Sequence, residues 1–363
     1  MRILAILGTR PEIIKLVPVI LALRNCAGVE VRLCHTGQHQ ALGLDLLAAT
    51  GIECDHMLSR ETGILLADLF PRLIAETGAV LNTDHPDLVI VQGDTATAAA
   101  GALSAFNRSI PIAHVEAGLR SGDLALPWPE EGYRRIISPL ARWHFAPTAG
   151  AADNLRRENI DPAAIHQTGN TVIDALHLAR EMLRSKPALG SEADTVLAAL
   201  GGAPFALATI HRREQDSDDL RNIGAALCDL AQDIAIVLPA HPRPESRVLI
   251  DVVKDHPAIH VVAPFDYFAF IRLLDAARLV LTDSGGIQEE GTALGKPVLV
   301  LRSVTERAEA VTAGAAQLVG NDMTAMLQAA RQHLADNTDP IPADVFGDGK
   351  AAQRIARILN ASV

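Results

Sequence analysis

Short runs of apolar residues alternate along most of the chain with longer segments in which apolar residues recur at helical spacing. This alternation is typical of βα units, in which helices connect the parallel strands of a sheet. Parallel sheets of this kind are covered by helices on both faces, so their strands read as continuous apolar runs. The sequence therefore predicts an α/β fold with doubly wound, Rossmann-like parallel sheets.

The pattern predicts strands in both halves of the chain. In the first half they are Arg2–Leu7, Val29–Cys34, Leu88–Val91, Ile112–Val115, His144–Ala146 and Ile165–Thr168, with helices that include Pro11–Leu23, Ala96–Phe106 and Ala151–Glu158. In the second half they are Phe205–Ile210, Ala235–Leu238, Ile259–Val262, Leu279–Thr282, Val298–Leu301 and Gln317–Val319, with helices at Asp218–Ala231, Phe268–Ala277, Ile287–Leu294 and Met323–Leu334. A terminal helix is expected near Ala351–Leu359.

The length indicates two domains, because 363 residues at about 150 residues per domain give a number near two. Turn-forming residues are concentrated around 186–204, next to a helical pattern. We place the domain boundary nearby, between about 170 and 205.

Charge and cysteine usage exclude several classes of protein. The formal net charge of −11 repels phosphate backbones, so nucleic acid is not an expected partner. The four cysteines form no CxxC pair, which fits neither a disulfide framework nor a tetrathiolate zinc site and indicates a reducing cytoplasm. The first apolar run is too short for a signal peptide, and no run of 18 apolar residues is present. We therefore expect neither secretion nor insertion into a membrane.

Ligands of open parallel sheets bind beyond the carboxyl ends of the strands, so the residues that follow each strand are candidates for the site. The segment Gly8–Glu12 follows the first strand and leads into a helix, where free backbone amides suit an anion. Arg10 adds a cation at this turn, and Lys15 follows about one helical turn later. No GxGxxG follows any strand, so a nicotinamide cofactor is not indicated.

Carboxylates follow the next strands of the first half. Asp94 ends a very apolar strand and could be either a functional carboxylate or the N-cap of the next helix. Glu116 ends the following strand beside a small residue and has no capping role. Glu130 and Glu131 stand in a proline-stiffened loop, and of these two Glu131 is expected to be the solvated one.

The strongest local pattern lies in the second half. A strand is followed by Ser284-Gly285-Gly286 and then by a helix, an arrangement whose backbone amides and hydroxyl can bind a second anion. Glu290 lies one turn into that helix, within reach of ribose hydroxyls. Arg307 follows the next strand at the same sheet edge. His211 directly follows a strand, and His241 has the same placement with weaker support. The histidines show no metal-ligand spacing.

Together these segments resemble the non-hydrolysing UDP-N-acetylglucosamine 2-epimerases over nearly the whole chain. The matching segments, in the order found in the family, are Gly8–Glu12, Gly93–Thr95, His114–Arg120, Pro127–Glu131, Gly169–Thr171, His211–Glu214, Asp283–Glu290, Thr305–Arg307 and Gly347–Gly349. The resemblance implies a GT-B-like fold of two Rossmann-like domains with a central cleft. It implies a first domain of residues 1–170 plus 350–363 with the acid/base carboxylates, and a second of residues 171–349 that binds UDP.

The resemblance also implies roles for individual residues. Asp94, Glu116 and Glu130 match the acid/base carboxylates, and His211 matches a residue that acts on the departing UDP. The positions that match UDP-sugar contacts are Arg10, Lys15, Phe270, Ser284, Gly285, Gly286, Glu290 and Arg307. The family needs neither NAD nor a metal, and the resemblance implies a cytoplasmic homodimer that serves polysaccharide biosynthesis.

The implied chemistry interconverts UDP-N-acetylglucosamine and UDP-N-acetylmannosamine. The proton at C2 is not next to a carbonyl, so its removal alone would leave an unstabilised carbanion. Expulsion of UDP from C1 while a base takes that proton gives a neutral glycal, to which UDP returns as C2 is protonated from the other face. Two acid/base groups and a cationic site for the diphosphate are therefore needed.

Three other functions remain open from the sequence. A GT-B glycosyltransferase is one, because fold does not fix function. A 2-epimerase of a UDP-diacetamido uronic acid is another, since Tyr133 and Arg243 stand where the family often has other residues. The third is a catalytically silent sensor of nucleotide sugars, against which the set of acid/base groups argues.

Overall fold

The computed structural model describes residues 1–38, 43–58, 64–210, 217–240, 244–302, 305–320, 322–336 and 343–361. The chain forms two compact units, one of Met1–Leu178 with Phe346–Val363 and one of Ala179–Val345. The boundaries predicted from sequence lie at 170/171 and 349/350, a few residues inside the first unit. The first turns of helix α7 (Thr171–Ser185) belong to that unit because the carboxylate of Asp174 accepts hydrogen bonds from the amides of Ala351 and Ala352.

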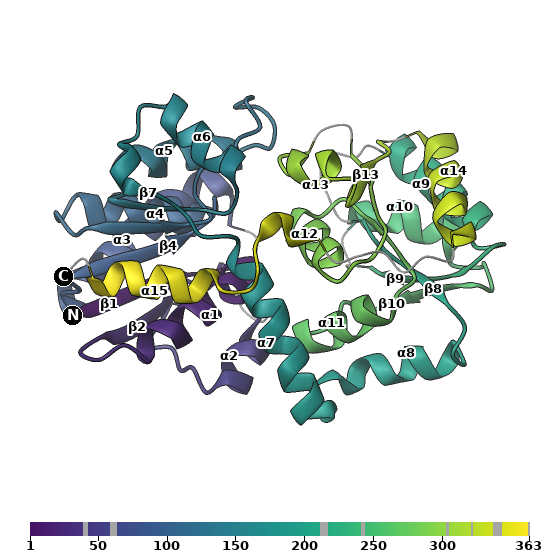
Figure 1. Ribbon diagram of the computed structural model, residues 1–363, viewed down its shortest axis with the longest axis horizontal. Helices are drawn as coiled ribbons and strands as arrows, with labels where there is room; N and C mark the ends of the chain where they lie inside the picture. The colour runs from purple at the N-terminus through teal and green to yellow at the C-terminus, as the bar shows by residue number, and fades with distance from the viewer. Residues whose placement is uncertain are drawn as a thin grey trace. The chain divides into compact units, whose positions relative to one another are not determined.

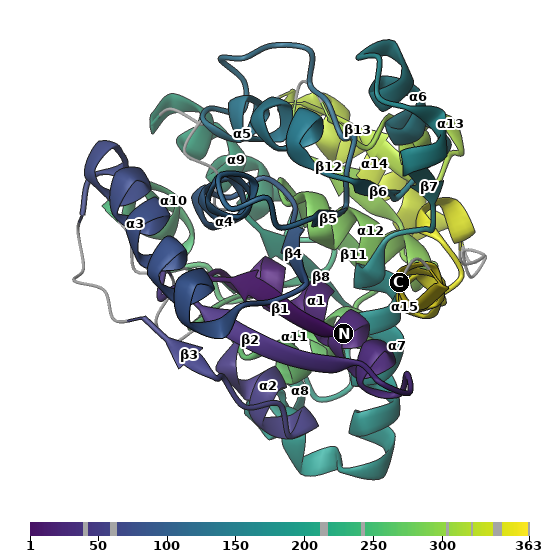
Figure 2. The same ribbon diagram turned by 90° about the vertical axis from the view of Figure 1, so that its left-hand side faces the viewer.

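The first unit contains a seven-stranded, all-parallel sheet in the order β3-β2-β1-β4-β5-β6-β7. Its strands are β1 (Arg2–Leu7), β2 (Glu30–His35), β3 (His56–Met57), β4 (Leu88–Gln92), β5 (Ile112–Val115), β6 (Trp143–Ala146) and β7 (Ile165–Gln167). Its helices are α1 (Arg10–Arg24), α2 (Leu44–Thr50), α3 (Leu66–Asp84), α4 (Ala96–Phe106), α5 (Glu130–Ile137), α6 (Ala149–Arg157), the start of α7, and α15 (Ala351–Ala361). Figure 2 shows α3 and α4 on one face of the sheet and α1 and α15 on the other.

The second unit contains a six-stranded, all-parallel sheet in the order β10-β9-β8-β11-β12-β13. Its strands are β8 (Phe205–Thr209), β9 (Ala235–Pro239), β10 (Ile259–Val262), β11 (Leu279–Thr282), β12 (Val298–Val300) and β13 (Ala316–Leu318). Its helices are α8 (Asp194–Ala199), α9 (Ser217–Leu230), α10 (Pro244–Val253), α11 (Tyr267–Ala276), α12 (Gly285–Ala293), α13 (Ala308–Thr312) and α14 (Met323–Ala335) (Figure 1). None of the helices in the described ranges is both long and apolar enough to cross a bilayer.

Both sheets place their first strand beside their fourth, so the direction of winding reverses there. This is the doubly wound arrangement, and the prediction of an α/β fold with two parallel sheets is confirmed. The strands are buried along their length because helices cover both faces, as in β4, all of whose residues are buried. Helix α4 packs closely on this sheet because most of its residues are alanine or glycine, and Thr95 caps it by accepting from the amide of Ala98.

Candidate active site

The turn after β1 binds one of the protein's own carboxylates. Glu12 is fully buried, and its Oε2 accepts hydrogen bonds from the amides of Gly8 (3.0 Å) and Thr9 (2.8 Å) and from the Thr9 hydroxyl (2.8 Å). Its Oε1 accepts from the Thr95 hydroxyl at 2.6 Å. Burial raises the pKa of Glu12 to about 7, against the effect of these donors. The prediction that the Gly8 and Thr9 amides are free for an anion is therefore wrong.

Glu116 follows β5 and is held by charged and polar side chains. Lys15 Nζ lies 2.6 Å from both of its oxygens, and the two side chains are 8% and 5% exposed. The amide of Gln92 also donates to Oε2, and the amide of Asn170 donates to Oε1 at 2.9 Å. A Cβ on Gly93 would lie 3.5 Å from Oε2, so this carboxylate packs against the turn that leads to Asp94. The structure thus brings two predicted site residues, Lys15 and Glu116, into direct contact.

The backbone of Glu116 is itself unusual. Its φ of 62° lies in the left-handed region, which costs a residue with a side chain about 1–2 kcal/mol. Such a conformation persists only where the surroundings hold it, and it is concentrated at functional sites. The ion pair with Lys15 and the amide contacts supply that restraint.

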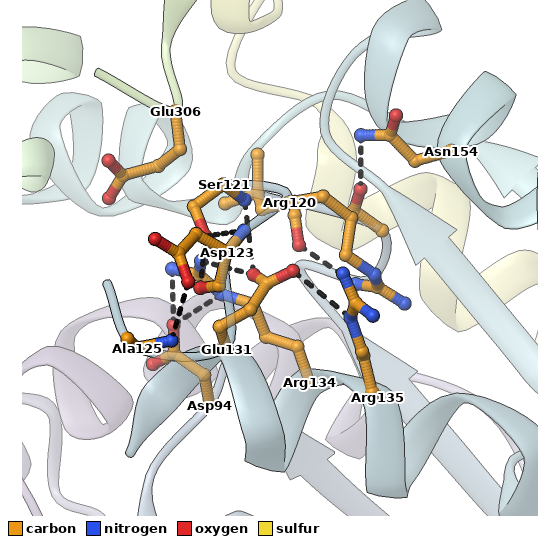
Figure 3. Close-up of polar contacts among 12 residues, drawn as sticks. Asp94, Arg120, Ser121, Asp123, Ala125, Glu131, Arg134, Arg135, Asn154 and Glu306 are labelled. Carbon is orange, nitrogen blue, oxygen red and sulfur yellow. Dashed lines mark hydrogen bonds and ion pairs between the residues drawn. The ribbon is translucent and has the colours of Figure 1, made fainter. Parts of the chain in front are cut away.

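Asp94 belongs to a second cluster of charges. The cap of α4 is Thr95 rather than Asp94, which leaves the Asp94 carboxylate to pair with Arg134 at 2.6 Å. Arg134 also contacts Glu131 at 3.3 Å (Figure 3). The Asp94 side chain remains 26% exposed, whereas that of Arg134 is 6% exposed. An arginine bound in this way fixes the direction of the Asp94 carboxylate while one side stays open to solvent.

The expectation that Glu131 is solvated is wrong. Glu131 is fully buried in α5, where it accepts a hydrogen bond from the amide of Ser121 at 3.1 Å and pairs with Arg134 and Arg135 (Figure 3). Glu130 is the first residue of α5 and is half-buried. Helical geometry turns adjacent residues about 100° apart, so one of the pair enters the core and the other stays nearer the surface. Glu130 is the partly accessible member.

The turn after β11 differs from the turn after β1. Ser284 is the N-cap of α12, and its amide donates to the Thr282 hydroxyl at 3.0 Å. Position N3 of α12 is Ile287, which has no carboxylate to reach back, whereas N3 of α1 is Glu12. A Cβ on Gly286 would meet no atom within 4 Å. Because the first amides of any helix lack intrahelical acceptors, this turn can receive an anion.

Arg307 lies against this turn. A Cβ on Gly285 would come within 2.5 Å of the guanidinium, so only glycine allows the approach. Arg307 is 5% exposed, and it pairs with Glu289 at 2.8 Å and with Glu306. The guanidinium of Arg307 therefore has two carboxylates as partners.

Two further predicted residues lie on neighbouring helices of the second unit. Glu290 is buried in α12 and accepts a hydrogen bond from the Tyr267 hydroxyl at 2.9 Å. Phe270 is half-buried in α11, the same helix as Tyr267. The side chain of Glu290 is thus oriented by α11.

Two buried histidines flank the carboxylates of the first unit. His114 Nε2 donates to the carbonyl of Gly93 at 2.7 Å, and His144 is its partner on the neighbouring strand. Burial lowers the pKa of each to about 4, so both are neutral at pH 7. The neutral His114 ring holds the Gly93 turn that precedes Asp94.

Arg10 is half-buried at the first position of α1. His211, His241 and Arg243 lie outside the described residues. Among the residues that the structure describes, no three His, Cys, Asp or Glu side chains are grouped as a metal site requires.

Several partners of the predicted residues are not predicted from the sequence. They are Gln92 and Asn170, which donate to Glu116, and Tyr267, which donates to Glu290. The role of Glu12 was detectable, because Thr9-x-x-Glu12 has the spacing of a capping box. Nothing in the local sequence indicates the other three contacts, which join residues far apart in the chain.

Comparisons with known proteins identify similar chains of almost the same length. A family model described as UDP-N-acetylglucosamine 2-epimerase matches residues 21–360. The UDP-N-acetylglucosamine 2-epimerase of Escherichia coli K12 is 41% identical over 375 residues, which cover 99% of this chain and 98% of that protein. The enzyme of the same name from Neisseria meningitidis serogroup A is 39% identical over 337 residues, which cover 92% and 91%.

Solved structures show the same similarity. Neisseria meningitidis UDP-GlcNAc 2-epimerase bound to UDP-GlcNAc superposes with a TM-score of 0.91 at 36% identity, covering 99% of both chains. Staphylococcus aureus MnaA with UDP gives 0.90 at 35% identity, covering 99% of this chain and 96% of that one. The Methanocaldococcus jannaschii enzyme with UDP-GlcNAc and UDP gives 0.88 at 34% identity, covering 99% and 100%.

Proposed function

The chain belongs to the UDP-N-acetylglucosamine 2-epimerase family, and we propose that it interconverts UDP-N-acetylglucosamine and UDP-N-acetylmannosamine by eliminating and re-adding UDP. Its fold is GT-B-like α/β, as in the similar epimerase structures. The observation that supports the chemistry best is Glu116, a buried carboxylate held by Lys15 in a left-handed backbone conformation at the carboxyl end of β5.

The first unit supplies the acid/base groups in this proposal. Lys15 and the two side-chain amides hold the carboxyl group of Glu116 in one place, which suits a group that takes the proton from one face of C2. Asp94, directed by Arg134 and partly exposed, and Glu130, the half-buried carboxyl at the start of α5, are the candidates for proton transfer on the other face. Such chemistry needs two differently placed groups, and this unit holds three.

The second unit supplies the UDP site. The turn from Ser284 to Gly286 offers helix amides to the diphosphate, and Arg307 lies against it. A diphosphate would replace Glu289 and Glu306 as a partner of the guanidinium as charge develops on the departing UDP. Glu290, which accepts a hydrogen bond from Tyr267, is the candidate acceptor for the ribose hydroxyls, and Phe270 is the candidate aromatic near the uracil.

The proposal extends to the assembly and the cellular role of the protein. Family resemblance supports a cytoplasmic homodimer that serves polysaccharide biosynthesis. Light scattering coupled to size-exclusion chromatography tests the oligomer, and a mass of one 38.6 kDa chain at micromolar concentration would refute the dimer.

The structure removes one reason for the uronic-acid alternative. Tyr133 is 8% exposed in α5, and its ring stacks on Phe70 at 5.2 Å between centroids. This side chain is part of the core of the first unit, so its departure from the usual family residue does not indicate a different sugar.

Proton NMR of UDP-N-acetylglucosamine incubated with the protein in D2O, without added cofactor, tests the proposal. Because the proton removed from one face need not be the one returned to the other, UDP-N-acetylmannosamine should form with deuterium at C2. Release of UDP without a C2 epimer would indicate a transferase instead. Epimerisation without deuterium uptake would contradict elimination between separate acid/base groups.

Neutralising the proposed carboxylates tests their assignment. Asp94→Asn, Glu116→Gln and Glu130→Gln should each cut turnover by roughly 10²–10⁴, the range for losing a positioned acid or base. Asp153→Asn, whose side chain is 60% exposed on α6, is the matched control and should keep wild-type turnover. Near-normal turnover in all three variants would refute the assignment.

A further inference from the structure

Asn170 contacts three different parts of the first unit at once. It is 1% exposed, and its Nδ2 donates to Glu116 Oε1 at 2.9 Å. Its Oδ1 accepts from the amide of Val172 at 3.2 Å, as an N-cap of α7 does. Its backbone amide donates to the carbonyl of Phe346 at 2.7 Å. We propose that Asn170 is a positioning residue that fixes the carboxylate of Glu116 to the place where the chain crosses between its two units.

The segment just before Asn170 is fastened to the part of the chain that returns to the first unit. The chain passes between the units at 178/179 and at 345/346. Close to these points Gly169 and Gly347 touch backbone to backbone, since a Cβ on either would come within about 3.1 Å of the Cα of the other. Arg354 adds a hydrogen bond to the carbonyl of Thr168 at 2.9 Å. The amide of Asn170 is therefore anchored to the point where the chain returns to the first unit, at Phe346.

The side chain required at position 170 must accept from a helix amide and donate to a carboxylate at the same time. Asparagine has both groups, whereas aspartate can only accept and serine caps but is shorter. Lys15 contacts both oxygens of Glu116, so its charge does not fix the rotation of the carboxylate about its own axis. Gln92 donates to Oε2 and Asn170 to Oε1, so the two amides define the plane of the carboxylate.

This inference rests on the proposed function of Glu116 as an acid/base group. A carboxylate that is free to rotate is no longer oriented toward C2 of the sugar. Misplacement by about 1 Å costs roughly 10²-fold in rate. Loss of the Asn170 contact should therefore appear in kcat and leave the affinity for the UDP group, which depends on the second unit, unchanged.

Asn170→Ser and Asn170→Asp separate positioning from folding, because both residues are good N-caps. Asn170→Ser should lower kcat by roughly 10- to 100-fold while KM for UDP-N-acetylglucosamine stays within about twofold. In a Glu116→Gln background the same change should have no further effect. Asp322→Ser, at the exposed N-cap of α14, is the control and should leave kcat unchanged. Wild-type kcat in Asn170→Ser would overturn the proposal.

A measurement without substrate distinguishes failure of this inference from failure of the proposed function. Carboxyl carbons labelled with ¹³C report the titration of Glu116, assigned by its absence in Glu116→Gln. Within the described part of the chain, Lys15 is a charged contact of this group. Asp94 follows the turn that packs against it, and the neutral ring of His114 holds that turn. Asn170→Asp puts a second carboxylate beside Oε1, so the titration should move to higher pH. An unmoved titration would overturn the contact, whereas a moved titration in a protein without epimerase activity would overturn only the proposed function.

Discussion

Replacing Glu12 by glutamine tests how the first unit closes its β1–α1 turn. Burial raises the pKa of Glu12 from 4.5 to about 7, so between these values the folded chain binds a proton that the unfolded chain has released. Stability therefore falls as pH rises through this window. A change of that size corresponds to about 3 kcal/mol of the free energy of unfolding. Glutamine does not titrate, so Glu12→Gln lacks this contribution.

Urea denaturation of both proteins at intervals from pH 4.5 to 7.5 measures the effect. His114 and His144 titrate in the same range with the opposite sign, so the comparison uses the difference between wild type and variant rather than either profile. Wild type should lose about 3 kcal/mol relative to Glu12→Gln as pH rises across the window. Glu53→Gln, at an exposed position, is the control and should give a flat difference. A flat difference for Glu12→Gln would show that its four donors outweigh burial and keep the carboxylate ionised.

Two further predictions concern buried charge. The pKa of His144 is lowered to about 4, so the wild-type protein should lose stability as pH falls from 6.5 to 4. In acid denaturation curves, His144→Met should remove about 3 kcal/mol of that loss. An unchanged loss of stability in acid would contradict the buried neutral ring. Arg307→Lys keeps a positive charge beside Glu289 and Glu306 but loses the planar fork, so calorimetry should show UDP affinity reduced by about tenfold, the equivalent of one charge-assisted hydrogen bond. Unchanged affinity would remove Arg307 from the UDP site.

The strands were predictable because parallel sheets require uninterrupted apolar runs. Arg2–Leu7, Ile112–Val115 and Leu279–Thr282 have the bounds that the sequence predicts. The elements that were missed lack this signal. Strand β3 has only two residues, and α5 begins with charged residues after a loop, although its later residues pack into the core. The strand order of each sheet then follows from the doubly wound topology rather than from any local pattern.

The site was predictable only as far as its strand ends. The sequence places Glu116 and Asp94 at one edge of a sheet, because the carboxyl ends of parallel strands lie together. It does not reveal that Glu116 contacts Lys15, which is 101 residues away in the sequence, or Asn170, which is 54 residues away. It also gave the wrong member of the pair Glu130 and Glu131 as solvated, because that choice depends on how α5 is rotated against its neighbours.

The two units have the same strand order up to the sixth strand, but the turn from β1 into α1 and the turn from β11 into α12 differ in how they can meet an anion. At N3 of α1, Glu12 places a carboxylate on the amides of Gly8 and Thr9, so an external anion would have to displace an acceptor that is already bound. At N3 of α12, Ile287 has no carboxylate to place on the start of its helix, and the amides of Asp283 and Ser284 donate to the uncharged Thr209 carbonyl and Thr282 hydroxyl instead. A diphosphate is itself an anion, so it should select the α12 turn and avoid the α1 turn. The hydrogen bonds of Glu12 instead hold the first residues of α1 in place. Lys15, in the same helix, contacts Glu116. Under the proposed function, the doubly wound sheet of the second unit holds the leaving group and that of the first unit holds the proton-transfer groups.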